Sequence, residues 1–251
     1  MMKSIGIPVM VFLWSGTVFA AHPLITDDAG TQGKGKFQLE VNGEYSRNNE
    51  DGATENAAGA ATLLSYGLAD DRDVVLGVPY QHIRTNDSGT ATVEGGVSDV
   101  SLELKWRFYQ EDGLAFALKP GITLPTGDDE KGMGAGKVAY SLFFIATREL
   151  NPWAFSLNLG YRRNENTADE RVDIWHASLA SEAEVVKNLK AVANIGIESS
   201  PDRTSSAPPA FILGGVIYAL SENVDVDFGV KSGLHTSEVD YAILAGTTLR
   251  F

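Results

Sequence analysis

The sequence predicts an all-β fold, a single antiparallel up-and-down transmembrane β-barrel of twelve strands. Segments of about ten residues alternate between apolar and polar side chains, which is the pattern of a strand with one apolar face. Short turns alternate with longer, more polar loops along the chain, as they do in outer-membrane barrels. The last alternating run stops on Phe251, the final residue of the sequence. Together these observations favour a membrane barrel.

The first twenty residues predict export. Lys3 precedes an apolar stretch over residues 5–14, and small residues follow up to Ala20. A positive start, a short apolar core and small residues before a cut site are typical of a secretory signal peptide. The alternative is a membrane anchor, but the stretch is shorter than the ~20 residues that a spanning helix needs. We therefore expect a signal peptide over 1–20, cleaved after Ala20, and a barrel domain over 21–251.

Composition limits the class of protein. The formal net charge is −13, which argues against a nucleic-acid partner, because such partners call for a basic surface. The chain has no Cys, so it offers no disulfide, thiolate metal site or Cys nucleophile. After the signal peptide, no segment approaches the ~18 consecutive apolar residues of a membrane helix. Residence in a membrane would therefore require a closed barrel.

The alternation assigns the twelve strands. The clearest is 98–109, where Leu102, Leu104 and Trp106 alternate with charged residues. The least clear is the second, which is rich in Ala and Gly. The predicted ranges are 36–46, 56–66, 73–84, 98–109, 114–124, 137–148, 152–163, 172–186, 189–199, 209–220, 224–235 and 239–251.

The predicted connections form two sets. The short ones are 67–72, 110–113, 149–152, 187–188 and 220–223, and they carry Gly, Pro and Asn of the kind found in hairpin turns. The longer ones are 47–55, 85–97, 125–136, 164–171 and 199–208, followed by a short one near 235–238. An even count of strands places both ends of the barrel on the short-turn side, which we expect to be periplasmic.

The aromatic residues bear on which face of each strand is outside. Alternation alone fits a soluble barrel or sandwich with inward apolar residues as well as a membrane barrel with outward ones. Two rings of aromatic side chains near the strand ends are the girdles expected at lipid headgroups. Those near short turns are Phe37, Tyr66, Trp106, Phe108, Trp153, Phe155, Tyr218 and Phe251. Those near long loops are Tyr45, Tyr80, Tyr140, Tyr161, Trp175 and Tyr241.

Outward apolar residues would leave a set of charged residues lining the lumen. Mixed charges there would set the electrostatics of permeation. The alternative is a plug in which opposite charges satisfy each other, and the pattern does not choose between pore and plug at this barrel size. The candidate lumen-lining residues are Glu40, Glu44, Glu103, Lys105, Arg107, Lys119, Arg162, Asp225, Asp227, Lys231, Asp240 and Arg250.

Two acidic runs could suggest divalent cation sites. They are Asp27-Asp28 and the run 128–130, and hard cations prefer clustered carboxylates. The runs are expected at opposite ends of the barrel and lack a known binding spacing, so we interpret them as solvated loops. We expect no metal and no cofactor.

His176 and Ser178 form the one pattern that suggests catalysis. A period of two puts both side chains on one face of a strand, where His could activate Ser as a nucleophile. However, Trp175, Ala177 and Leu179 form the apolar face of this strand, so the pair is expected to point into the lumen. We therefore expect no catalytic residues and no enzymatic activity.

Several segments resemble the meta-pathway phenol-degradation family of bacterial outer-membrane barrels. They are His22–Asp28, continuing through 33–40, the stretch 119–128, the Gly-rich 132–136, and 96–105. The resemblance covers essentially the whole mature chain. It implies an outer-membrane transporter of small, hydrophobic or aromatic compounds and supplies no catalytic residues.

The expected function is passive passage of small solutes through the outer membrane, hydrophobic or aromatic ones among them. A closed structural or surface-interaction barrel and an outer-membrane acyl hydrolase are the alternatives. The expected partners are outer-membrane lipid, lipopolysaccharide and the barrel assembly machinery. By resemblance to outer-membrane barrels, Phe251 is expected to be part of the signal that this machinery reads.

Overall fold

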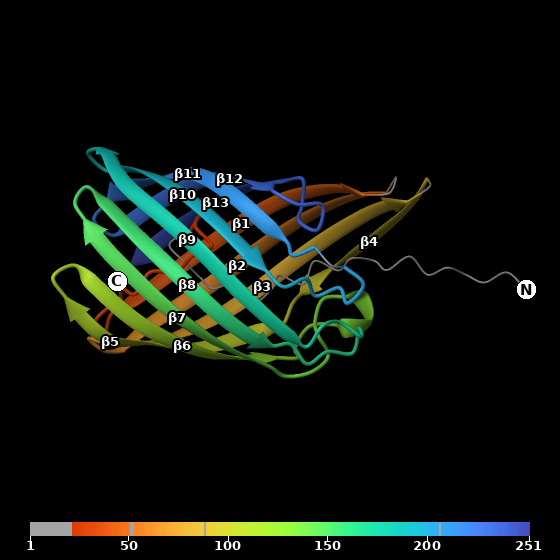
Figure 1. The fold of residues 1–251 in the computed structure, drawn as a ribbon, viewed down its shortest axis with the longest axis horizontal. Helices are drawn as coiled ribbons and strands as arrows, with labels where there is room; N and C mark the ends of the chain where they lie inside the picture. The colour runs from red at the N-terminus through yellow and green to blue at the C-terminus, as the bar shows by residue number, and fades with distance from the viewer. Residues whose placement is uncertain (1–21, 51–52, 88, 206) are drawn as a thin grey trace, which may run out of the picture.

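The computed structural model describes residues 22–50, 53–87, 89–205 and 207–251. Thirteen strands lie within these residues, and twelve of them close into one antiparallel barrel, with β4 outside it (Figure 1). The strands are β1 Phe37–Glu50, β2 Ala53–Ala69, β3 Arg72–Asp87, β4 Thr90–Val97, β5 Val100–Glu111, β6 Leu114–Leu124, β7 Ala139–Leu150, β8 Trp153–Arg163, β9 Asp173–Val186, β10 Leu189–Glu198, β11 Ala210–Ser221, β12 Val224–Gly233 and β13 Tyr241–Arg250.

The first and last strands close the barrel. β1 pairs with β13 in antiparallel register from Gln38 opposite Arg250 to Arg47 opposite Tyr241. Just beyond this ladder, the Phe37 N–H donates to the Phe251 carbonyl at 3.1 Å and the Phe251 N–H donates to the Phe37 carbonyl at 2.9 Å. Every neighbouring pair around the barrel is antiparallel, so the predicted fold class and its twelve barrel strands are confirmed.

The outer face of the barrel is apolar and the inner face is polar. On β5, Leu102, Leu104 and Trp106 are exposed, whereas the alternate residues Glu103 and Lys105 are buried. The same alternation recurs on β3, β8 and β10. A soluble barrel buries its apolar face, so this structure has the inverted pattern of a barrel made for an apolar solvent.

The predicted loop 85–97 is wrong. β3 runs on to Asp87, and residues 90–97 form β4, which pairs with the C-terminal half of β3. The N-terminal half of β3 pairs with β5, so the barrel wall passes from β3 to β5 and β4 lies outside it (Figure 1). Ala91, Val93 and Val97 of β4 share one face, but Gly95 interrupts it and the strand has only eight residues, so the alternation is a weak signal. The predicted loop 47–55 is also shorter than expected, because β1 extends to Glu50 and β2 begins at Ala53.

The long loop after β6 is held by side chains rather than by a sheet. It contains one turn of 3-10 helix, Asp129–Lys131, capped by the Asp128 side chain. The hydrogen bond to Lys131 holds the pKa of the Asp128 carboxyl below its ordinary value. Asp99 fixes the loop from outside the turn, since its two carboxylate oxygens accept from the Gly127 N–H at 2.9 Å and the Ala135 N–H at 2.7 Å.

The expected signal peptide lies outside the described residues. Among the residues described, no helix is long and apolar enough to cross a membrane.

Candidate functional site in the barrel interior

The barrel interior is crossed by the segment that precedes β1. We call residues 22–36 the lumen segment. It leaves the start of β1 beside the β2–β3 turn, where the Gly35 N–H donates to the Gly67 carbonyl at 2.8 Å. From there it passes inward, and Leu24, Thr26, Asp27 and Ala29 are all buried. The interior therefore contains a piece of chain that is not part of the wall.

Two asparagines of the wall hold the backbone of the lumen segment. Asn158 on β8 accepts from the Asp27 N–H at 2.8 Å and donates to the Asp27 carbonyl at 2.7 Å. Asn194 on β10 accepts from the Ile25 N–H at 2.7 Å and the Thr26 N–H at 3.0 Å. These bonds satisfy buried backbone groups that would otherwise lack partners.

The Asp27 side chain lies between two buried lysines. Its carboxylate accepts from Lys105 Nζ at 2.8 Å and from Lys119 Nζ at 3.1 Å. Lys119 also pairs with Glu103 at 3.0 Å, and the Lys119 side chain is 1% exposed. Because a buried ion needs partners to offset its lost hydration, Asp27 is a structural counter-ion for this part of the wall.

The beginning of the segment contacts the opposite side of the barrel. His22 Nδ1 and the Asp227 carboxylate on β12 are within hydrogen-bonding distance. Pro23 lies against the inner surface at two wall glycines, where a Cβ added at Gly229 would come within 2.8 Å of the Pro23 ring and one at Gly215 within 2.9 Å. Glycine at these positions therefore makes room for the lumen segment.

An apolar patch lines the same side of the interior. Leu24 belongs there to a cluster of buried side chains from β9, β10, β11, β13 and the loop before β13. The patch consists of Ala180, Val192, Phe211, Leu213, Ile217, Val239, Ala242 and Leu244. The interior is thus charged around Asp27 and apolar around Leu24, three residues apart in the chain.

His176 and Ser178 point into the interior, as their strand face predicts. His176 Nε2 lies 2.9 Å from Ser178 Oγ, and His176 Nδ1 lies 3.3 Å from a Glu198 carboxylate oxygen. Thr26 Oγ1 donates to Ser178 Oγ at 2.7 Å, so the lumen segment covers the hydroxyl. The three wall residues have the order of a Ser-His-acid relay, and Ser178 at its end bonds to Thr26 of the lumen segment.

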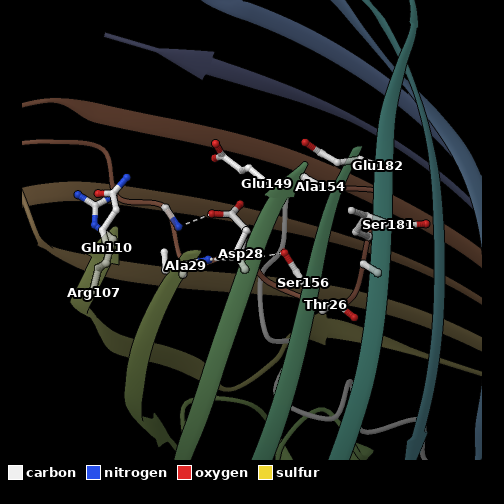
Figure 2. A pocket seen from close by; sticks show the side chains of 15 residues that line it. Thr26, Asp28, Ala29, Arg107, Gln110, Glu149, Ala154, Ser156, Ser181 and Glu182 are labelled. Carbon is white, nitrogen blue, oxygen red and sulfur yellow. Dashed lines mark hydrogen bonds between the residues drawn. The ribbon is translucent and has the colours of Figure 1, made fainter. Parts of the chain in front are cut away.

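A cavity of about 260 Å³ separates the lumen segment from β5 to β9. Figure 2 shows Thr26, Asp28 and Ala29 of the segment on one side of this space. Polar wall residues surround it, and they include Arg107, Gln110, Glu149, Ser156, Ser181 and Glu182. Several of these lie near the short turns, so this vestibule is at the short-turn end of the interior.

The predicted lumen-lining residues are distributed over three environments. Those that are buried are Glu40, Glu103, Lys105, Lys119, Asp227 and Lys231. Those that are partly buried are Glu44, Arg107, Arg162, Asp225 and Arg250. Asp240 precedes β13 and is exposed, where it accepts two hydrogen bonds from Asn49 at 3.1 and 2.7 Å.

Ion pairs on the inner face involve several of these residues. Lys231 lies 3.7 Å from Glu44 and 3.3 Å from Glu238, and all three side chains are largely buried. Near the short-turn end, Arg250 pairs with Asp225 at 2.7 Å. The wall therefore satisfies part of its own charge, and the lumen segment supplies the rest through Asp27.

The interpretation of Asp27 as part of a solvated loop is wrong, since Asp27 is 1% exposed and bonded to lysines. The sequence analysis missed the lumen segment because its residues do not alternate. It also missed Asn158 and Asn194, although a signal for them exists. Each is a polar residue between two apolar ones on its strand, which predicts an inward position.

The fold is similar to those of solved outer-membrane barrels. A crystal structure of an outer membrane channel from Pseudomonas putida F1 superposes with a TM-score of 0.68 at 15% identity, over 89% of this chain and 98% of that one. The NanC porin matches with a TM-score of 0.57 at 9% identity, over 84% and 98% of the two chains. The KdgM porin matches with a TM-score of 0.53 at 9% identity, over 85% and 99%.

Among curated protein sequences, none matches this chain. A family model described as "Putative MetA-pathway of phenol degradation" matches residues 23–251, which include nearly all of the lumen segment and the whole barrel. The chain therefore belongs to this family.

Proposed function

We propose that this protein is an outer-membrane channel for passive passage of small solutes, hydrophobic or aromatic ones among them, and that it is not an enzyme. The observation that carries the proposal is that the barrel wall and the lumen segment inside it are distinct parts of the chain. A closed wall with a polar, charged inner face surrounds one segment that is not part of the wall. The similarity to solved channels and porins supports the same proposal.

Location in the outer membrane is supported by the outer surface. Large apolar side chains are exposed on every part of the barrel, including Leu104, Leu157, Ile195 and Phe228. Soluble monomers rarely expose contiguous apolar patches beyond a few hundred Å². Lipid would cover this surface, and lipopolysaccharide and the barrel assembly machinery are the proposed partners.

Passage would require the lumen segment to move. The segment is held by hydrogen bonds and ion pairs, together with Leu24 and Pro23. Water can replace the hydrogen bonds of the segment, whereas the buried lysines need another anion in place of Asp27. The strands of the wall pair with one another, so the segment can leave without unfolding the wall. The apolar patch that it uncovers would accept a hydrophobic solute.

A closed structural barrel is the second candidate, and the filled interior favours it. Swelling of protein-containing liposomes separates the two. Sugars, aromatic acids and phenols should be compared with the same solutes in protein-free liposomes, because phenols also cross lipid unaided. Protein-dependent entry of aromatic compounds supports the channel. Entry of none of the solutes would favour the closed barrel.

A further inference from the structure

We propose that Asp27 occupies a binding site for the carboxylate of an amphipathic monocarboxylate solute. The carboxylate of the solute would replace that of Asp27 between Lys105 and Lys119, and its apolar body would replace Leu24 on the apolar patch. This inference rests on the proposed channel function and names the class of solute that the interior recognises.

The lysine pair shares one carboxylate that the lumen segment supplies. Lys105 and Lys119 supply two positive charges, and Glu103 pairs with Lys119 from the wall itself. Asp27 supplies the second negative charge, and it is the only one of the four groups that belongs to the lumen segment. When the segment leaves, Lys105 loses the carboxylate that accepts its hydrogen bond, while the buried wall carboxylates Glu40 and Asp73 stay near it. The carboxylate of a solute can take the vacated place between the two lysines.

The geometry suits a carboxylate. The two oxygens of Asp27 are bonded separately, one to each ammonium, at 2.8 and 3.1 Å. Charge-assisted bonds of this kind are stronger than neutral ones. An alcohol or amide of the same shape would have to take the place of a charge, so the site discriminates against neutral solutes.

The distance between the two parts of the site limits the solute. Asp27 and Leu24 are three residues apart, so at most about 10 Å of extended chain separates their positions. A solute that fills both places has a carboxylate and an apolar body within that span. The vestibule borders Leu24, Thr26 and Asp28, so it reaches the residues on either side of Asp27.

The test uses the full-length protein in lipid nanodiscs and fluorine NMR. The probes are 4-(4-fluorophenyl)butyrate and its neutral amide. In the wild type, the tethered Asp27 competes at high effective concentration, so binding should be weak. Asp27→Ala empties the place between the lysines and should bind the carboxylate at least about tenfold more tightly, with no gain for the amide.

Two further variants serve as controls. Asp169→Ala removes an exposed carboxylate of the loop after β8, which pairs with Arg203 at 2.9 Å, and should bind like the wild type. Lys105→Met in the Asp27→Ala background should abolish the gain, and it strands no carboxylate because Asp27 is already absent. If Asp27→Ala does not fold, as judged by heat-modifiable migration, Asp27→Asn keeps the shape and should show the same preference for the anion.

A folded Asp27 variant with no preference for the carboxylate over the amide would overturn the inference, as would an equal gain in Asp169→Ala. The measurement does not depend on permeation. Binding without liposome swelling contradicts only the channel, whereas swelling without a carboxylate preference contradicts only this inference.

Discussion

Neighbouring residues on one strand of this barrel face different surroundings, with apolar side chains outside and polar or charged ones inside. Leu104 and Trp106 point outward and Lys105, between them, points inward to Asp27. The period of two predicted these faces from the sequence. It could not predict what Lys105 contacts, because that partner is far away in the chain and belongs to a segment without periodicity.

Substitutions on the outer face of β5 test its contact with lipid. Leu104→Arg should cost about 2–4 kcal/mol if the residue lies near the bilayer midplane, and Trp106→Arg, closer to the short-turn interface, only about 0–1 kcal/mol. Unfolding midpoints in lipid vesicles measure both. Equal, large losses would instead indicate that both side chains are core residues of a soluble fold.

Substitution of Lys119 tests the contribution of the buried charges to stability. Lys119→Met leaves Glu103 without its lysine and Asp27 with one lysine, and breaking a buried pair in this way costs about 3–5 kcal/mol. The double variant Lys119→Met/Glu103→Gln should recover part of that loss, since no wall carboxylate is then stranded. Chemical denaturation of both variants gives the difference. A double variant as unstable as the single one would show that the pair with Glu103 does not matter.

At the scale of elements, the sequence predicted the strands much better than the loops. The structure has a barrel strand at each of the twelve predicted ranges. β4 escaped prediction because its apolar face is short and interrupted by Gly95, and it extends a hairpin with β3. The loop after β6 has glycines and acidic residues that gave no reason to expect a fixed shape, and Asp99 supplies that shape from another loop.

Asp99→Ala should loosen the loop 125–136 while leaving the barrel intact. It removes the acceptors of the Gly127 and Ala135 N–H groups. Trypsin should then cleave after Lys131, which is exposed, several times faster than in the wild type. Asp202→Ala, in the loop after β10, is the matched control and should leave that rate unchanged. Unchanged cleavage in Asp99→Ala would mean that the 3-10 turn holds the loop by itself.

At the scale of the whole molecule, closure of the barrel wall and filling of its interior are separate properties. Closure follows from the alternating strands and was predicted. Filling follows from the lumen segment, and the sequence left pore and plug equally open. The family resemblance drew attention to residues 22–28, but their position inside the barrel depends on Asn158, Asn194 and the lysine pair acting together, and no pattern in the chain brings these residues together before folding.

Closure of the barrel predicts an effect of deleting Phe251. This residue makes two backbone hydrogen bonds with Phe37 at the seam between β1 and β13. It is also the proposed assembly signal. Without it, the amount of protein recovered from the outer membrane should fall several-fold, because insertion is impaired. Phe251→Tyr, which keeps an aromatic end and both backbone bonds, should insert normally. Full recovery and unchanged heat-modifiable migration after the deletion would contradict this role.

The central claim is that solutes pass through the barrel interior when the lumen segment moves. The chain has no Cys, so two introduced cysteines have no native thiol to compete with. Thr26 Oγ1 and Ser178 Oγ are 2.7 Å apart, close to the ~2 Å between bonded sulfurs. The double variant Thr26→Cys/Ser178→Cys should therefore lock the segment to β9 when oxidised. Single-channel current and liposome entry of aromatic solutes are then measured on the same sample before and after reduction. We predict that both are lost on oxidation and return with reductant. Equal passage in the locked and the reduced protein would contradict the account.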